Sequence, residues 1–176
     1  MKKLVLVFLL SVLPTAFFCQ SAFDKFDGQD DVTSVIVNKK MFEMMGSVKK
    51  DNKDKESQQY LSFIKNLDNL KVFSTTSTRV TSEMKATADK YMKSAGLEEL
   101  MRINDSGRNI KIWVKSGSKD SQIKELLMFM EGTSKGNETV LMSLTGDFDL
   151  NEISVLTDKM RLPGGDELKK ATKGKK

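Results

Sequence analysis

The sequence predicts an α+β fold, in which a single domain contains one mostly antiparallel sheet with three or four helices packed mainly on one face. Two observations lead to this prediction. Short turn-forming stretches separate four apolar runs in the second half of the 176-residue chain, a pattern typical of an antiparallel meander of four strands. The first half mixes strand-like and helix-like stretches, and no unit of roughly 20 to 50 residues repeats along the chain.

The first half begins with residues 32–37, which are rich in β-branched side chains and therefore predict a strand. Residues 41–45 continue as a short apolar helix that ends at Gly46. Residues 49–57 contain no apolar side chain, so they are predicted to form a solvated connection. Helical spacing of apolar side chains then returns over residues 60–67.

A second strand is predicted over residues 70–74, and the clearest helix of the chain follows over residues 80–95. One stripe of this helix is apolar, while charged side chains occupy its other faces. Gly96 stands where a left-handed residue commonly ends a helix. We expect the stripe to pack into the core; it consists of Val80, Met84, Ala88, Tyr91 and Ala95.

The second half is predicted to be the meander of four strands, followed by a last helix from Leu150 to Met160. Because antiparallel sheets often leave one face to water, we expect the helices to cover the other face. The four apolar runs of the meander are residues 100–103, 110–114, 123–130 and 139–144.

The N-terminus has the layout of a bacterial export signal, and residues 1–21 are predicted to be a signal peptide. Lys2 and Lys3 give a short basic start, and an almost unbroken apolar run follows over residues 4–13. Cys19 leaves two outcomes open, which are simple cleavage near this residue or its lipidation as in lipoprotein signals. The predicted location is periplasmic or extracellular, with a lipid-anchored outer-membrane protein as the alternative.

The rest of the chain is predicted to be a single α+β domain over residues 22–162 and a disordered basic tail over residues 163–176. Removing the two lysines of the signal and the five of the tail changes the net charge from +5 to −2. The positive charge therefore belongs to the two ends of the chain and not to a binding face, so no nucleic-acid partner is predicted. A membrane contact is expected only through the tail or through a lipid on Cys19.

The chain after Cys19 contains no cysteine and no histidine. This excludes thiol or imidazole catalysis and thiolate or imidazole metal sites from the mature protein. Glycine-rich phosphate loops, nucleophile elbows and dinucleotide fingerprints are also missing from the sequence. The prediction is no catalytic residue, no cofactor and no metal site.

The strongest candidate for a functional loop contains Asp147, Asp149, Asn151 and Glu152. The first three match the oxygen-ligand spacing of a calcium-binding loop, but Glu152 stands where such a loop needs glycine. In the structural interpretation, Asp149 is a helix N-cap and Glu152 completes a capping box, while Phe148 and Ile153 form a hydrophobic staple. The second interpretation uses more of the residues, so a helix cap is predicted.

A candidate interaction surface is formed by Lys111, Trp113 and Lys115. Alternation along this stretch places these three side chains on one face of a strand and three aliphatic side chains on the other. A single aromatic residue between two lysines is a weak stacking platform for nucleic acid. We expect Trp113 to be a partly exposed sheet residue or a residue covered by a helix.

Several segments resemble a family of small exported proteins of Bacteroidetes-type bacteria, known only as domain of unknown function, number four-two-five-two. The most specific segment is Ser-Leu-Thr-Gly-Asp-Phe-Asp-Leu at residues 143–150. The resemblance implies an envelope location and supplies no activity, so it assigns no catalytic residue. The segments are residues 32–37, Met41 and Phe42, residues 97–101, 110–115 and 140–150.

Three functions remain open from the sequence. The leading hypothesis is a non-enzymatic envelope protein that binds another protein or a surface through one sheet face or the loops at one end. The alternatives are a hydrolase that acts through Asp147 and Asp149, and a divalent-ion-binding envelope protein that uses the same loop.

Overall fold

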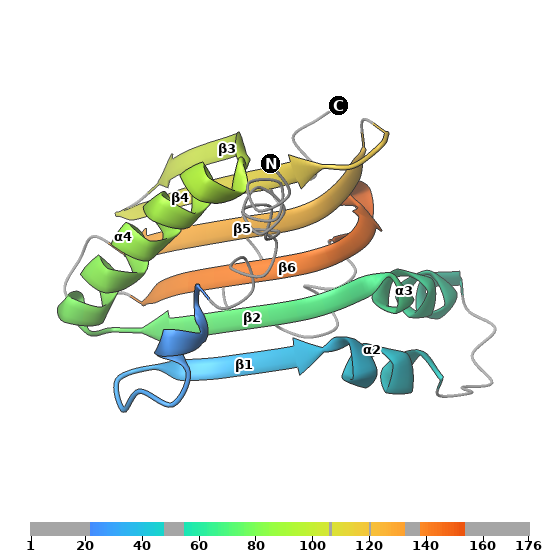
Figure 1. Cartoon of the computed structure of the whole chain (residues 1–176), viewed down its shortest axis with the longest axis horizontal. Helices are drawn as coiled ribbons and strands as arrows, with labels where there is room; N and C mark the ends of the chain where they lie inside the picture. The colour runs from blue at the N-terminus through green and yellow to red at the C-terminus, as the bar shows by residue number, and fades with distance from the viewer. Residues whose placement is uncertain (1–21, 48–54, 106, 120, 133–137, 154–176) are drawn as a thin grey trace, which may run out of the picture.

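The computed structural model describes residues 22–47, 55–105, 107–119, 121–132 and 138–153 (Figure 1). These residues form an α+β domain built on one six-stranded sheet, in which every neighbouring pair of strands is antiparallel. The elements are η2 Asp24–Phe26, β1 Thr33–Asn38, α2 Lys39–Gly46, α3 Lys55–Lys65, β2 Leu67–Thr75, α4 Thr78–Ala95, β3 Glu98–Asp105, β4 Arg108–Ser116, β5 Gln122–Gly132, β6 Thr139–Asp149 and η3 Leu150–Glu152.

The predicted meander is confirmed, because β3, β4, β5 and β6 pair in sequence order. The strand order of the whole sheet is β1-β2-β6-β5-β4-β3. The last strand therefore returns to the middle of the sheet and pairs with β2, which comes from the first half of the chain. The sequence pattern did not indicate this pairing.

The prediction that the helices pack mainly on one face of the sheet is wrong, because the two faces carry different helices. α4 covers one face, where its apolar stripe packs with Phe73, Leu127 and Leu141 (Figure 1). Phe42 of α2 and Phe63 of α3 belong to the core of the opposite face. The reason is visible in β5, whose successive residues 126–130 are all buried and so point to both faces.

The clearest predicted helix is confirmed as α4. Its buried residues are Val80, Met84, Ala88 and Tyr91, and the helix ends at Gly96, which is left-handed with φ of 65°. The backbone N–H of Gly96 donates to the carbonyl of Met92. The two strands and two helices predicted in the first half are likewise observed, as β1, α2, α3 and β2.

Several predicted segments lie outside the described residues. These are the signal peptide with Cys19, the basic tail and most of the last helix, of which η3 and Ile153 are described. Among the residues that the structure describes, no helix is both long and apolar enough to cross a bilayer.

Candidate ligand-binding site

A cavity of about 200 Å³ lies between α4 and the strands β3, β4 and β5. Two of the three residues predicted as an interaction surface, Lys111 and Trp113, line it, whereas Lys115 does not. The complete lining consists of Lys85, Asp89, Arg102, Asn104, Asn109, Lys111, Trp113, Phe129 and Glu131.

Strand register brings the floor of this cavity together. Lys111 of β4 is directly opposite Arg102 of β3 and Phe129 of β5. In the next row of the same face, Asn109 is opposite Asn104 and Glu131. The β3–β4 register follows from the hairpin connection, so counting outward from the turn is enough to place Arg102 beside Lys111.

Trp113 is buried, with 2% of its surface exposed, and belongs to the core cluster under α4. Of the two expectations for Trp113, the partly exposed sheet residue is wrong, and the residue covered by a helix is what the structure shows. Among the residues that the structure describes, none accepts a hydrogen bond from the buried indole N–H of Trp113. A buried donor without an acceptor costs about 1 to 3 kcal/mol of stability.

Several charged groups of the cavity are arranged in ion pairs. Lys85 Nζ lies 2.7 Å from a carboxylate oxygen of Glu131. Arg102 donates from two nitrogens to Glu99, at 3.0 and 2.6 Å. The hydrogen bonds from Arg102 lower the pKa of Glu99, and the charge of Lys111 acts in the same direction. Three cationic and two anionic side chains line the cavity, and Glu99, which is paired with Arg102, adds a third anion beside it.

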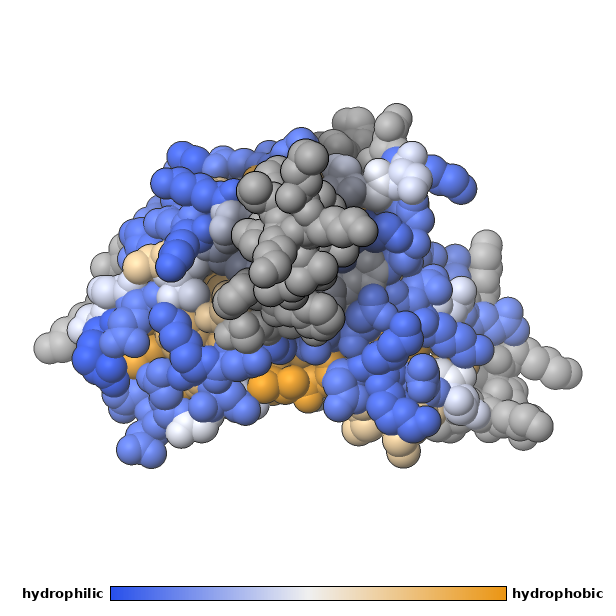
Figure 2. Space-filling view, viewed as in Figure 1, coloured by the Kyte–Doolittle hydropathy of each residue, from blue (hydrophilic) through white to orange (hydrophobic). Residues whose placement is uncertain are grey.

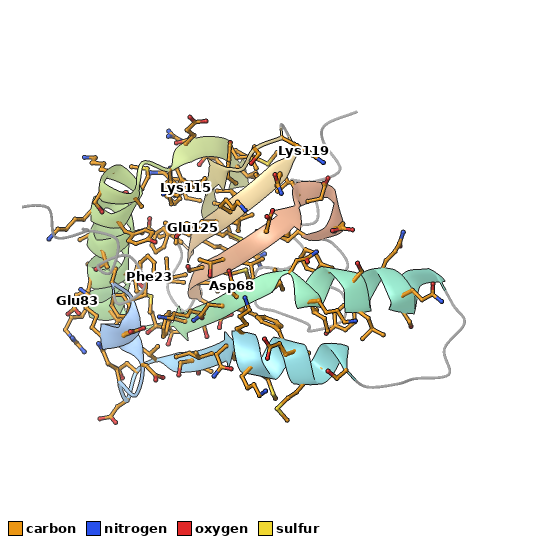
Figure 3. All side chains as sticks on the ribbon, turned by 45° about the vertical axis from the view of Figure 1, so that its right-hand side comes forward. Phe23, Asp68, Glu83, Lys115, Lys119 and Glu125 are labelled. Atoms are coloured by element: carbon orange, nitrogen blue, oxygen red, sulfur yellow. The ribbon has the colours of Figure 1, made fainter. Side chains whose placement is uncertain are left out.

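Lys115 lies outside the cavity, opposite Glu125 of the neighbouring strand (Figure 3). Glu125 is 5% exposed and accepts a hydrogen bond of 2.6 Å from the hydroxyl of Tyr91. Burial raises the pKa of Glu125, an effect that the Tyr91 hydrogen bond and the charge of Lys115 partly oppose. This residue was not predicted from the sequence, although a glutamate within the apolar run 123–130 was a usable signal.

In the loop that was predicted as a helix cap, the structure describes one hydrogen bond of a capping box. The carboxylate of Glu152 accepts a hydrogen bond from the backbone N–H of Asp149, which is the return bond of a capping box. Phe148 and Ile153 are both buried in the same core cluster, as a staple requires. Asp149 also accepts a hydrogen bond of 2.7 Å from Ser121. The side chain of Asn151 lies outside the described residues.

The side chain of Asp147 contacts two side chains of β5. It accepts hydrogen bonds from Lys124, at 2.5 Å, and from the side-chain amide of Gln122. These contacts, led by the one from Lys124, lower the pKa of Asp147. A general acid of a hydrolase needs a raised pKa, so Asp147 lacks the property that this hypothesis requires. Within the described ranges, no three histidine, cysteine, aspartate or glutamate side chains are gathered as metal ligands.

Gly146, the residue before Asp147, lies where the backbone leaves no room for a side chain. A Cβ atom built on Gly146 would lie 2.4 Å from the carbonyl oxygen of Asn66 and 2.9 Å from the Cα atom of Leu67. The same carbonyl accepts the backbone N–H of Asp147 at 2.8 Å. The close approach occurs where the register of β2 against β6 shifts between Leu67 and Asn69.

Comparison with curated proteins gave no match, and no solved structure matches the chain. A family match was found, and it covers residues 26–156, which include every described strand and helix from β1 to η3. It thus contains the cavity, the Tyr91–Glu125 pair and the capped loop. The chain belongs to the family described as "Domain of unknown function (DUF4252)".

Proposed function

We propose that this protein is an exported, non-enzymatic binding module of the cell envelope, which holds a carboxylate-bearing group of another envelope component in the Trp113 cavity. The observation that carries the proposal is the cavity itself, in which Lys111 and Arg102 lie beside the ring of Trp113. Export rests on the signal-like residues 1–21, and the protein is either released by cleavage or anchored by a lipid on Cys19.

The chemistry of the lining favours a carboxylate. Lys111 supplies an ammonium group and Arg102 a guanidinium on the neighbouring strand, at positions directly opposite each other. Arg102 is already paired with Glu99, so Lys111 is the cation of the lining that would bind the carboxylate. Charge-assisted hydrogen bonds to a carboxylate are also stronger than bonds between neutral groups. The volume of about 200 Å³ suits a small group rather than a large cofactor.

Two kinds of partner carry the required carboxylate, namely acidic sugars and acidic amino acids. Trp113 is the only tryptophan of the chain, so its fluorescence reports directly on the cavity. We expect titration with glucuronate or with glutamate to change its emission, whereas glucose, which lacks the carboxylate, should leave it unchanged. A response to glucuronate alone identifies an acidic sugar, and a response to glutamate alone identifies an acidic side chain.

Two matched variants test the site. Lys111→Met should weaken binding about tenfold, since a hydrogen bond to a charged group contributes roughly 1.5 to 3 kcal/mol. Lys115→Met removes a lysine from the same strand but not from the cavity, so it should bind as the unaltered protein does. The proposal fails if neither carboxylate changes the Trp113 emission or gives calorimetric heat, or if the two variants bind equally.

A further inference from the structure

The first strand, β1, forms one edge of the sheet, and among the described residues only β2 pairs with it. Its six residues, Thr33–Asn38, include no charged residue and no proline. Val35 and Ile36 are 38% and 43% exposed, and they point to opposite faces of the strand because successive side chains alternate. Figure 2 shows this apolar surface over β1, with paler apolar surface over α2. Both sides of this edge are therefore apolar.

β3, the opposite edge of the sheet, has features that prevent another strand from pairing with it. β3 carries Glu98, Glu99 and Arg102, all exposed, and its register against β4 shifts between Glu99 and Met101. Charges and bulges of this kind prevent a second strand from pairing with an edge. β1 has neither device, so it is the edge that can accept another strand.

The residues on either side of β1 have opposite charges. Asp30 and Asp31 precede the strand, Lys39 and Lys40 follow it, and all four are exposed. If a second copy of β1 lies antiparallel to the first, the acidic turn before the strand of each copy lies at the same end as the start of α2 in the other copy, where Lys39 and Lys40 stand. A two-fold axis repeats this arrangement at both ends of the strand. The same strand thus supplies both halves of a complementary surface.

We infer that two copies of this protein pair edge to edge through β1, antiparallel and about a two-fold axis near Val35, so that their sheets form one continuous sheet. Backbone hydrogen bonds between the two β1 strands hold the dimer. Contact between the apolar side chains sets its register, and the acidic and basic ends favour the antiparallel orientation. The exposed Met41 and Met44 of α2 lie next to the end of this interface. The inference does not depend on the Trp113 cavity, which lies at the β3–β5 side of the sheet.

The first test is the molar mass of the exported protein, measured by sedimentation velocity over loading concentrations that span two orders of magnitude. We expect a monomer–dimer equilibrium. Ile36→Lys, which places a charge in the middle of the edge, should weaken the dimer at least tenfold. Ser118→Lys adds the same charge at an exposed position away from β1 and should have no effect. Circular dichroism must show that both variants remain folded.

The second test uses charge reversal and distinguishes a second copy from a foreign strand. Asp30→Lys alone and Lys40→Glu alone should each weaken the dimer, because each puts like charges near one another at both ends of the interface. An equimolar mixture of the two variants should form heterodimers, since every contact then joins opposite charges. Val35→Cys should also cross-link the dimer under mild oxidation, while the unaltered chain under the same treatment serves as the control.

Several results would overturn the inference. These are a monomer at every concentration, a dimer that survives both Ile36→Lys and the single charge reversals, or a mixture of charge variants that stays monomeric. A monomer whose β1 edge instead binds an extended segment of another protein would also overturn it.

Discussion

The hydroxyl of Tyr91 on α4 donates a hydrogen bond of 2.6 Å to the carboxylate of Glu125 on β5. This contact joins the helix to the centre of the sheet and gives the buried carboxyl a partner. Glu125 is labelled on the sheet in Figure 3. Glu125 has a raised pKa, with burial as the largest cause, so the fold favours its neutral form. The pair therefore links the stability of the domain to pH.

The first prediction follows from the direction of this shift. The folded protein binds the Glu125 proton more tightly than the unfolded chain does, so stability should fall as pH rises from about 4.3, the ordinary value for glutamate, through the raised pKa. Glu125→Gln keeps an acceptor for Tyr91 and removes this titration. Urea unfolding at several pH values should show the variant more stable than the unaltered protein at neutral pH, with the advantage lost near pH 4.

The control for this prediction is Glu131→Gln, which removes a carboxylate that is paired with Lys85 at the surface of the same strand. It should not reproduce the stabilisation at neutral pH. If Glu125→Gln changes neither the stability at neutral pH nor its dependence on pH, the carboxyl is not held in its neutral form.

The second prediction concerns Gly146. Gly146→Ala would force a Cβ atom against the carbonyl of Asn66 at 2.4 Å, and both groups belong to paired backbone that cannot move easily. We expect a loss of about 1 to 3 kcal/mol or more in the free energy of unfolding, as for other overpacked sites.

Gly96→Ala is the comparison for this variant, because a Cβ atom at Gly96 meets nothing within 4 Å and the cost is only that of its left-handed backbone. That cost is about 1 to 2 kcal/mol. Thermal unfolding should rank Gly146→Ala as the more damaging substitution. Equal effects would show that the close approach at Asn66 is not maintained in solution.

The third prediction tests the helix cap. Asp149→Ala removes the acceptor of Ser121 and the proposed N-cap, so it should cost about 1 kcal/mol. Phe148→Ala removes a buried ring that packs edge-on against Phe63 and should cost about 3 to 5 kcal/mol. Neither effect should depend on calcium or on a chelator. A melting temperature that rises with calcium in the unaltered protein, but not in Asp149→Ala, would instead identify a ligand loop.

Local pattern predicted most of the elements correctly, for identifiable reasons. The apolar stripe of α4 and the stop at Gly96 depend on residues within one helix, and the meander depends on hairpin connections between successive strands. The capping residues around Asp149 are also close in sequence. Each of these features is determined by side chains within a few residues of one another.

The candidate site was only partly predictable. Alternation placed Lys111 and Trp113 on one face of a strand, but it could not show that α4 covers Trp113. Lys85 and Glu131, which complete the cavity, are far apart in sequence and meet only through packing. The buried Tyr91–Glu125 bond likewise joins a helix to a strand 34 positions later.

The sequence by itself determined the α+β class, most of the described elements, the four-strand meander and the end of α4 at Gly96, because each follows from periodicity or turn chemistry over a short stretch of chain. Only the tertiary structure decided that β6 pairs with β2, that helices cover both faces of the sheet, and that β1 is left as an apolar edge. These features depend on contacts between distant segments. These contacts form because both faces of the central strands must be buried. A pattern within a short stretch of sequence cannot indicate them.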